Sequence, residues 1–295
     1  MIEALKGNNR YWYLVYIALL LILFLYIMFP DRILNGFLNA QAEKRFPDLS
    51  ISFEDTRLIL PLGIRIRGLE VALKYNPYEL LYVSEKTSLR VSITGLLFGR
   101  NKVTFTSRVN GGEISGIFEE KDKESCNITI DIDDIILDGK PFILPGTGKY
   151  IEGVLAGRVS FTGNPSDFIN GKGDISLDAK KGIIKPVLPL FDVRDIGFEK
   201  ISLTGVLDNM RFNVKDLSMK GGPINGKARG DLQLKRDILS SGLRFSAEIT
   251  PTPEMKIEMP DIAGAIESSN IMKNGKLKFD IQGTLTNPLP VIRRC

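Results

Sequence analysis

"NGKLKFDIQGTLTNP", residues 274–288, alternates between apolar and polar side chains with a period of two. Phe279 and Ile281 fall on one parity, whereas Lys278 and Asp280 fall on the other. Side chains that alternate in this way belong to a β-strand with one apolar and one solvated face. The pattern therefore predicts a half-buried strand.

The same alternation recurs from Ile51 to the end of the chain, with glycine, asparagine and proline turn signals between the segments. It predicts an antiparallel meander of roughly fifteen strands with one wet face. At ~4.8 Å between strands, the sheet would run on the order of 70 Å. Twisted sheets rarely exceed about ten strands without curling, splitting or flattening. Three endings remain open: a sandwich, a sheet closed on itself, and a curled trough open along one side.

Helices are scarce in this region of the sequence. Residues 77–82 and 184–191 are the candidates, and two prolines make the second a doubtful helix. Residues 255–259 alternate between apolar and charged side chains, which predicts a further strand that carries Ile257 on its apolar side. The predicted fold is therefore mainly β.

Composition excludes several classes of function. The chain has no histidine, which removes His-dependent catalysis and His-ligated metals. The net charge is only +4 and its charges are interleaved, so the basic stripe that nucleic-acid binding needs is missing. Loops at 145–150 and 131–134 fail the spacing tests for a phosphate loop and a calcium loop. We expect no enzymatic activity, no cofactor and no nucleic-acid partner.

The two cysteines, Cys126 and Cys295, have no CxxC spacing. A disulfide between them is possible in an oxidising compartment, but the sequence favours two inert thiols.

Residues 11–29 form a run of nineteen residues without a charge. As a helix this run would be ~28 Å long, close to the ~30 Å thickness of a bilayer's hydrocarbon core. It predicts a transmembrane anchor. The residues expected to hold it in the membrane are Tyr11, Trp12, Tyr13, Phe24 and Phe29.

A cleaved signal peptide is the alternative, because Ala40-Gln41-Ala42 resembles a cleavage site. The long apolar run and its distance from that site favour an uncleaved anchor. Basic residues are almost equally divided between the two flanks, so the charge bias says little about orientation. The predicted organisation is a cytoplasmic tail at 1–10, a transmembrane helix at 11–29, an amphipathic helix and linker at 30–48, and a β domain at 49–295.

Ile33, Leu34, Phe37 and Leu38 follow a helical spacing after the anchor. The helix they predict either plugs one end of the β domain or lies on the membrane surface.

Several stretches carry a resemblance to a known family. They are FPDLSISFE (46–54), LPLGIRIRGLEVAL (60–73), LRVSITGLLFGRNKVTFTSRVNGGEISG (89–116), ISLTGVLDNMRFNVKDLSMKGGPINGKARGDLQL (201–234) and GKLKFDIQGTLTNP (275–288). With the anchor before them, they resemble the type II secretion system protein N family and, more distantly, the AsmA-like envelope proteins. The resemblance implies a single-pass protein of the Gram-negative inner membrane, with a periplasmic β domain and no catalytic residues.

Two functions follow as hypotheses. The first is an accessory scaffold that contacts other type II secretion subunits through its periplasmic domain, with exposed strand edges adding a partner's strand. The second is lipid handling, because the AsmA-like relatives imply a curled sheet with a groove for acyl chains. The expected groove lining is Ile175, Leu177, Leu203, Met210, Phe212, Leu232, Phe245, Ile257 and Phe279. These residues would otherwise pack on one another across the curled sheet.

Overall fold

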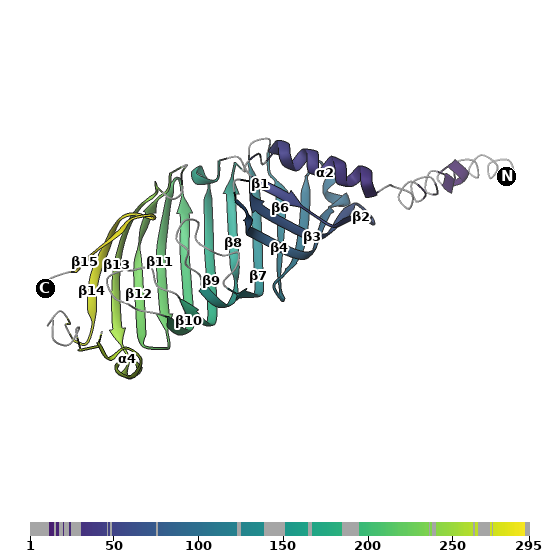
Figure 1. Cartoon of the computed structure of the whole chain (residues 1–295). Helices are drawn as coiled ribbons and strands as arrows, with labels where there is room; N and C mark the ends of the chain where they lie inside the picture. The colour runs from purple at the N-terminus through teal and green to yellow at the C-terminus, as the bar shows by residue number, and fades with distance from the viewer. Residues whose placement is uncertain are drawn as a thin grey trace, which may run out of the picture.

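Figure 1 presents the computed structural model of the chain, in which a long sheet dominates. The structure describes residues 12–14, 16–17, 20, 24, 31–45, 47, 49–74, 76–122, 125–138, 151–164, 167–184, 195–235, 237, 240–261, 263–264, 272 and 274–292.

All fifteen described strands belong to one antiparallel sheet, and their order across the sheet follows the chain. The strands are β1 (Leu49–Ser52), β2 (Asp55–Ile59), β3 (Gly63–Leu73), β4 (Asn76–Val91), β5 (Lys102–Val109), β6 (Gly112–Glu120), β7 (Cys126–Asp138), β8 (Ile151–Gly163), β9 (Lys172–Ile184), β10 (Ile196–Asp208), β11 (Arg211–Lys220), β12 (Ile224–Gln233), β13 (Gly242–Pro251), β14 (Leu277–Thr284) and β15 (Pro288–Ile292). Only β2 lies off this path, paired to β3.

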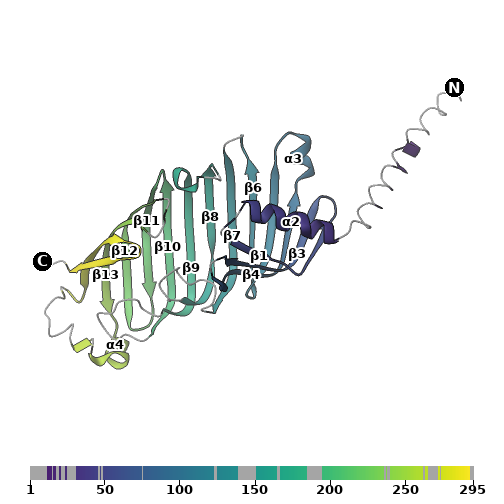
Figure 2. The same cartoon turned by 45° about the horizontal axis from the view of Figure 1, so that its top comes forward.

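The sheet is open, with β1 at one end and β15 at the other. Figures 1 and 2 show the strands side by side in a single twisted layer. The prediction of a mainly β, antiparallel meander is confirmed. Of the three endings that the sequence left open, neither the sandwich nor the closed sheet forms among the described strands.

Two-residue turns make this meander possible. Asn110 and Gly111 both have positive φ between β5 and β6, and Asn209 and Met210 do the same between β10 and β11. Turns of this kind match the right-handed twist of the strands that they join. In both hairpins each strand therefore pairs with the one before it.

The described helices are short and lie at the margins of the sheet. They are α2 (Asp31–Arg45), α3 (Ile93–Leu97), the 3₁₀ turn η1 (Phe168–Asn170) and α4 (Pro253–Glu258). The amphipathic helix predicted after residue 30 is α2, which lies against β1 and β2 and buries Leu34. It therefore covers one end of the sheet.

Two local predictions are wrong. Residues 77–82 were a candidate helix but belong to β4, because pairing with β3 holds this stretch extended. Residues 255–259 were expected to be a strand, but 255–258 belong to α4, which Pro253 begins with a φ suited to a helix. The candidate helix at 184–191 lies outside the described residues, except for Ile184 at the end of β9.

Within the stretches that the structure describes, no helix is long and apolar enough to cross a membrane. The predicted span at 11–29 is thus not supported, and most of it lies outside those stretches. Of the expected anchor residues, Trp12, Tyr13 and Phe24 are helical and exposed. Tyr11 and Phe29 lie outside the described residues.

Candidate functional site

One face of the sheet is mostly apolar, and we call it the apolar face. Residues that pair across antiparallel strands point to the same side, so the register traces rows that cross the sheet. One row contains Ile64, Leu89, Phe105, Gly116, Ile130, Val159, Ile175, Gly205, Val214, Gly230, Phe245 and Ile281. The next contains Ile66, Thr87, Ser107, Ile114, Ile132, Gly157, Leu177, Leu203, Leu217, Ala228, Ala247, Phe279 and Ile292. Neither row holds a charged residue.

Most of the expected groove lining lies together on this face. The residues that the register places there are Ile175, Leu177, Leu203, Phe212, Leu232, Phe245 and Phe279. All seven are half-buried rather than sealed from solvent. The alternation therefore placed these seven residues on one side of the sheet, whereas their role as a groove lining stays a prediction.

The other two expected lining residues lie elsewhere. Met210 has a φ of 62° in the turn between β10 and β11, so it is not a strand residue. Ile257 is on α4, where 82% of its surface is exposed. Both were assigned by extending an alternating pattern through a turn or a helix, where that alternation has no structural meaning.

Buried apolar residues are spread along the sheet, and one cluster of them lies on β5 and β7. Val109, Ile135 and Leu137 form a cluster, against which Tyr82 and Leu155 pack. Val109 and Ile135 are each only 1% exposed. This cluster stabilises the apolar face locally.

Four hydroxyl groups form a network on the apolar face beside the core cluster. Ser107 Oγ lies 2.7 Å from both Ser84 Oγ and Thr87 Oγ1, and Tyr82 donates its hydroxyl to it. Ser84 donates onward to the carbonyl of Arg108. Because buried hydroxyls are costly when unpaired, these bonds are what allow polar side chains on this face.

The opposite side of the sheet, which we call the polar face, carries cross-strand ion pairs. Glu248 lies 2.7 Å from Lys276 Nζ and 3.8 Å from Lys278 Nζ. The hydrogen bond from Lys276, followed by the charges of nearby lysines, lowers the pKa of Glu248 below its ordinary value. These pairs are solvated, so each adds little to stability.

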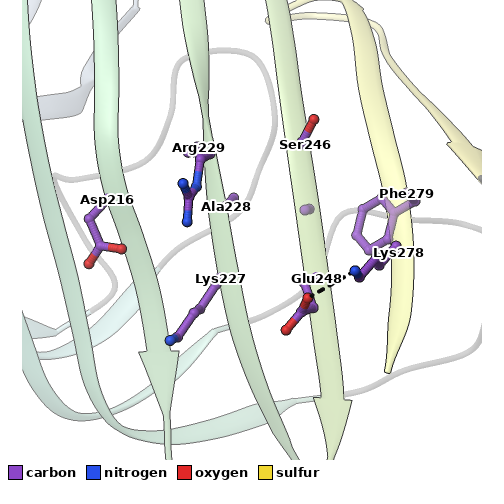
Figure 3. Close-up of a pocket in the computed structure, with 9 residues that line it drawn as sticks. Asp216, Lys227, Ala228, Arg229, Ser246, Glu248, Lys278 and Phe279 are labelled. Carbon is purple, nitrogen blue, oxygen red and sulfur yellow. Dashed lines mark ion pairs between the residues drawn. The ribbon is translucent and has the colours of Figure 1, made fainter. Parts of the chain in front are cut away.

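A hollow of about 450 Å³ opens beside these ion pairs (Figure 3). Asp216, Lys227, Arg229, Glu248 and Lys278 surround it from four adjacent strands. Acid and base alternate around it, and Ser246, which also lines it, donates a 2.9 Å hydrogen bond to Asp280. The arrangement is a solvated lattice of alternating charges.

Asp178 shows how the polar face holds its charges. Its carboxylate accepts a 2.6 Å hydrogen bond from Ser202 Oγ and lies 3.2 Å from Lys200 Nζ. The Ser202 bond, aided by the lysine charges, lowers the pKa of Asp178 despite partial desolvation. Asp178 is therefore ionised at neutral pH.

The described residues contain no group of three metal-ligating side chains that could hold a metal ion. Cys126 is free and 1% exposed, and its thiol donates to the carbonyl of Gly163. Burial raises the pKa of this thiol, which makes it a poor nucleophile at neutral pH. Cys295 lies outside the described residues.

Sequence reasoning missed a second apolar surface, which we call the α3 patch. Its members share exposed aliphatic or aromatic side chains on α3 and on the turn between β2 and β3. They are Leu60, Leu62, Ile93, Leu96, Leu97 and Phe98. The signal was present in the run Leu96-Leu97-Phe98, which breaks the alternation of the flanking strands.

Both ends of the sheet are poor templates for a partner's strand. Pro288 and Pro290 in β15 have no N–H to donate to a further strand. At the other end, β1 has only four residues and α2 lies against it. Strand addition, which the scaffold hypothesis invoked, is therefore disfavoured.

No protein-family model, no curated protein and no solved structure matches this chain.

Proposed function

We propose that this protein binds the acyl chains of lipids along the apolar face of its open sheet. The observation that carries this proposal is the register, which aligns uncharged rows across nearly the whole width of the sheet. A strip of this kind offers a continuous apolar path instead of a single pocket. Long apolar chains are the ligands that such a path fits.

Apolar surface on this scale needs a cover. Contiguous apolar patches larger than a few hundred Å² are rare on monomeric proteins unless they bind something. Among the described elements that flank the sheet, α2 makes its main contacts with β1 and β2 at one end. A bound acyl chain gains about 0.8 kcal/mol for each CH₂ removed from water, so a chain lying across several strands would be held firmly.

The shape of the face suits a flexible ligand. In the second of the two rows, Leu177, Leu203 and Leu217 are followed by Ala228 and Ala247 and then by Phe279. The small alanine side chains leave a shallow depression between the leucines and Phe279. Small side chains next to large ones along one row leave room for methylene groups without forming a pocket of fixed shape. The site would therefore accept the acyl chains of lipids that differ in their headgroups.

The apolar run at 11–29 bears on where the protein would meet its lipids. As a membrane anchor it would hold the sheet beside a bilayer, with residues 49–295 on the periplasmic side of a Gram-negative inner membrane. Lipid could then move between the bilayer and the apolar face without crossing water. This placement rests on the sequence pattern and on the resemblance stated above.

The decisive experiment replaces Phe245 with a photo-crosslinking amino acid in the full chain, expressed in Gram-negative cells. Irradiation followed by mass spectrometry should recover phospholipid attached at this position. The matched control is Arg244, the preceding residue, whose side chain lies exposed on the polar face. Lipid capture at Phe245 no greater than at Arg244 would refute the proposal.

A second candidate is the accessory role in type II secretion, exercised through periplasmic protein contacts. It is favoured by Leu289 and Val291, which are exposed on β15 on the side of Gln282 and Asp280, that is, on the polar face. Apolar side chains at the rim of an otherwise polar surface suit a protein interface. A crosslinker at Val291 should then capture other secretion subunits, and capture of none under gentle conditions would exclude this contact.

A further inference from the structure

The α3 patch is built to project apolar side chains. Ser92 caps the helix by accepting a 3.1 Å hydrogen bond from the Gly95 amide, and the Arg100 amide returns to the Gly95 carbonyl at 2.7 Å. These bonds close the segment into a compact loop. At its tip Leu97 is 78% exposed and Phe98 is 81% exposed. Leu97 and Phe98 are therefore the most exposed apolar residues of the loop.

The turn between β2 and β3 supports this loop. The Val91 amide donates to the Leu62 carbonyl at 2.8 Å, which joins the base of α3 to the turn. Leu62, Ile93 and Phe98 line one hollow of about 950 Å³. The exposed apolar residues of the two segments thus form one continuous surface.

Basic side chains surround that surface. The same hollow is lined by Arg90, Arg100 and Lys102, with Glu119 as its one carboxylate. Lys102 and Glu119 are register partners on adjacent strands, so this carboxylate offsets one of the three cations. An excess of positive charge remains around an apolar tip.

We propose that the α3 patch inserts into the interface of an anionic lipid bilayer. Leu97 and Phe98 would enter the boundary between headgroups and acyl chains, while the basic residues contact lipid phosphates. Apolar insertion together with electrostatic attraction to anionic lipids is the combination by which interfacial segments bind membranes. Each basic residue near such a surface contributes separately to binding.

The position of the patch agrees with this occupant. Figure 2 shows α3 and α2 at the same end of the sheet. Because α2 begins at Asp31, the apolar run at 11–29 joins the folded domain at this end. A bilayer that received this run would lie near the α3 patch. The proposal itself does not depend on acyl-chain binding to the apolar face.

A fluorescence experiment on the full chain tests the insertion. Leu97→Cys, in a Cys295→Ser background that retains the buried Cys126, is labelled with an environment-sensitive dye. The protein is reconstituted in nanodiscs of phosphatidylcholine with phosphatidylglycerol, which carry a spin-labelled lipid as quencher. The matched control is Ile257→Cys, because Ile257 is equally exposed but lies on α4.

We expect the quenching at position 97 to exceed that at position 257 by about threefold or more in anionic discs. In discs of phosphatidylcholine alone the quenching at 97 should fall. The triple variant Arg90→Gln, Arg100→Gln, Lys102→Gln should lose this dependence on anionic lipid. Equal quenching at 97 and 257 would overturn the proposal. Quenching at position 97 that changes neither with lipid charge nor in the triple variant would also overturn it.

Discussion

The ring of Phe105 lies over Gly116, the residue directly opposite it on the neighbouring strand of the apolar face. A Cβ added at Gly116 would stand 2.5 Å from a ring atom of Phe105 and 2.7 Å from the Thr129 carbonyl oxygen. The ring of Phe212 likewise covers Gly205 on the neighbouring strand, although the residue directly opposite Gly205 is Val214. Glycines on this face thus provide space that aromatic rings from adjacent strands occupy, which keeps the layer thin and free of gaps.

The variant Gly116→Ala should therefore be destabilised. Neither the ring nor the backbone carbonyl can move without disturbing the ladder, so overpacking should lower the free energy of unfolding by about 1–3 kcal/mol. Urea denaturation followed by circular dichroism measures this loss. Gly226→Ala is the matched control, because the nearest atom to its added Cβ is 3.8 Å away. An equal effect at both glycines would contradict the explanation.

Replacement of Phe279 by glutamate tests whether the apolar face binds a ligand or is a packed core. If acyl chains occupy the face, Phe279→Glu should reduce lipid capture at Phe245 by about tenfold, because an acyl chain that covers an unpaired carboxylate must remove it from water. The half-exposed position should limit the loss of unfolding free energy to under ~2 kcal/mol. A loss of about 4 kcal/mol or more would instead indicate a sealed core. Gln282→Glu, on the polar face of the same strand, should change neither quantity.

Ser107 is the centre of the hydroxyl network on the apolar face. Its replacement by alanine should lower the free energy of unfolding by about 1–3 kcal/mol, since the hydroxyls of Tyr82, Ser84 and Thr87 each lose a buried partner. Thermal or chemical denaturation tests this. The same change at the exposed Ser176 should fall within about 0.5 kcal/mol of wild type.

Asp178 should make stability depend on pH in acid. Its pKa is lowered in the folded state, so its contribution is present above the ordinary aspartate value of 3.8 and disappears as the pH falls through the lower folded value. The difference in unfolding free energy between wild type and Asp178→Asn should be constant near pH 6 and shrink below pH 3.8. Ser202→Ala should raise the pKa of Asp178, which nuclear magnetic resonance can follow. A difference that grows as the pH falls would contradict this assignment.

The thiol of Cys126 should resist modification in the folded protein. Burial and the hydrogen bond to the Gly163 carbonyl both disfavour the reactive thiolate. In the Cys295→Ser variant, a thiol reagent at pH 8 should label Cys126 only after denaturant is added. Rapid labelling without denaturant would show that the interior around β7 and β8 opens readily.

The strands and their faces could be predicted from the sequence because a period of two leaves a local signature. Leu177, Leu203 and Phe245 were placed on the apolar face correctly for this reason. Ile257 was misplaced because Pro253 begins a helix there, and the alternation of side chains does not reveal that helix. Local pattern cannot distinguish a strand from a short helix when no neighbour is known.

Other features depend on contacts between distant residues. Two examples are the contact between Phe105 and Gly116 and the hydrogen bond between Ser84 and Ser107, which depend on the register of neighbouring strands. Alternation alone does not fix that register, because a shift of two residues keeps every side chain on the same face. The α3 patch likewise needs the Val91–Leu62 hydrogen bond to join two segments.

By itself, the amino-acid order determined the strand type, the antiparallel meander and which side chains share a face, since these follow from alternation and turn residues. Only the tertiary structure decided that the sheet stays open and that its apolar rows align. Closure and alignment depend on the summed twist and register of all fifteen strands, a property that no single segment carries.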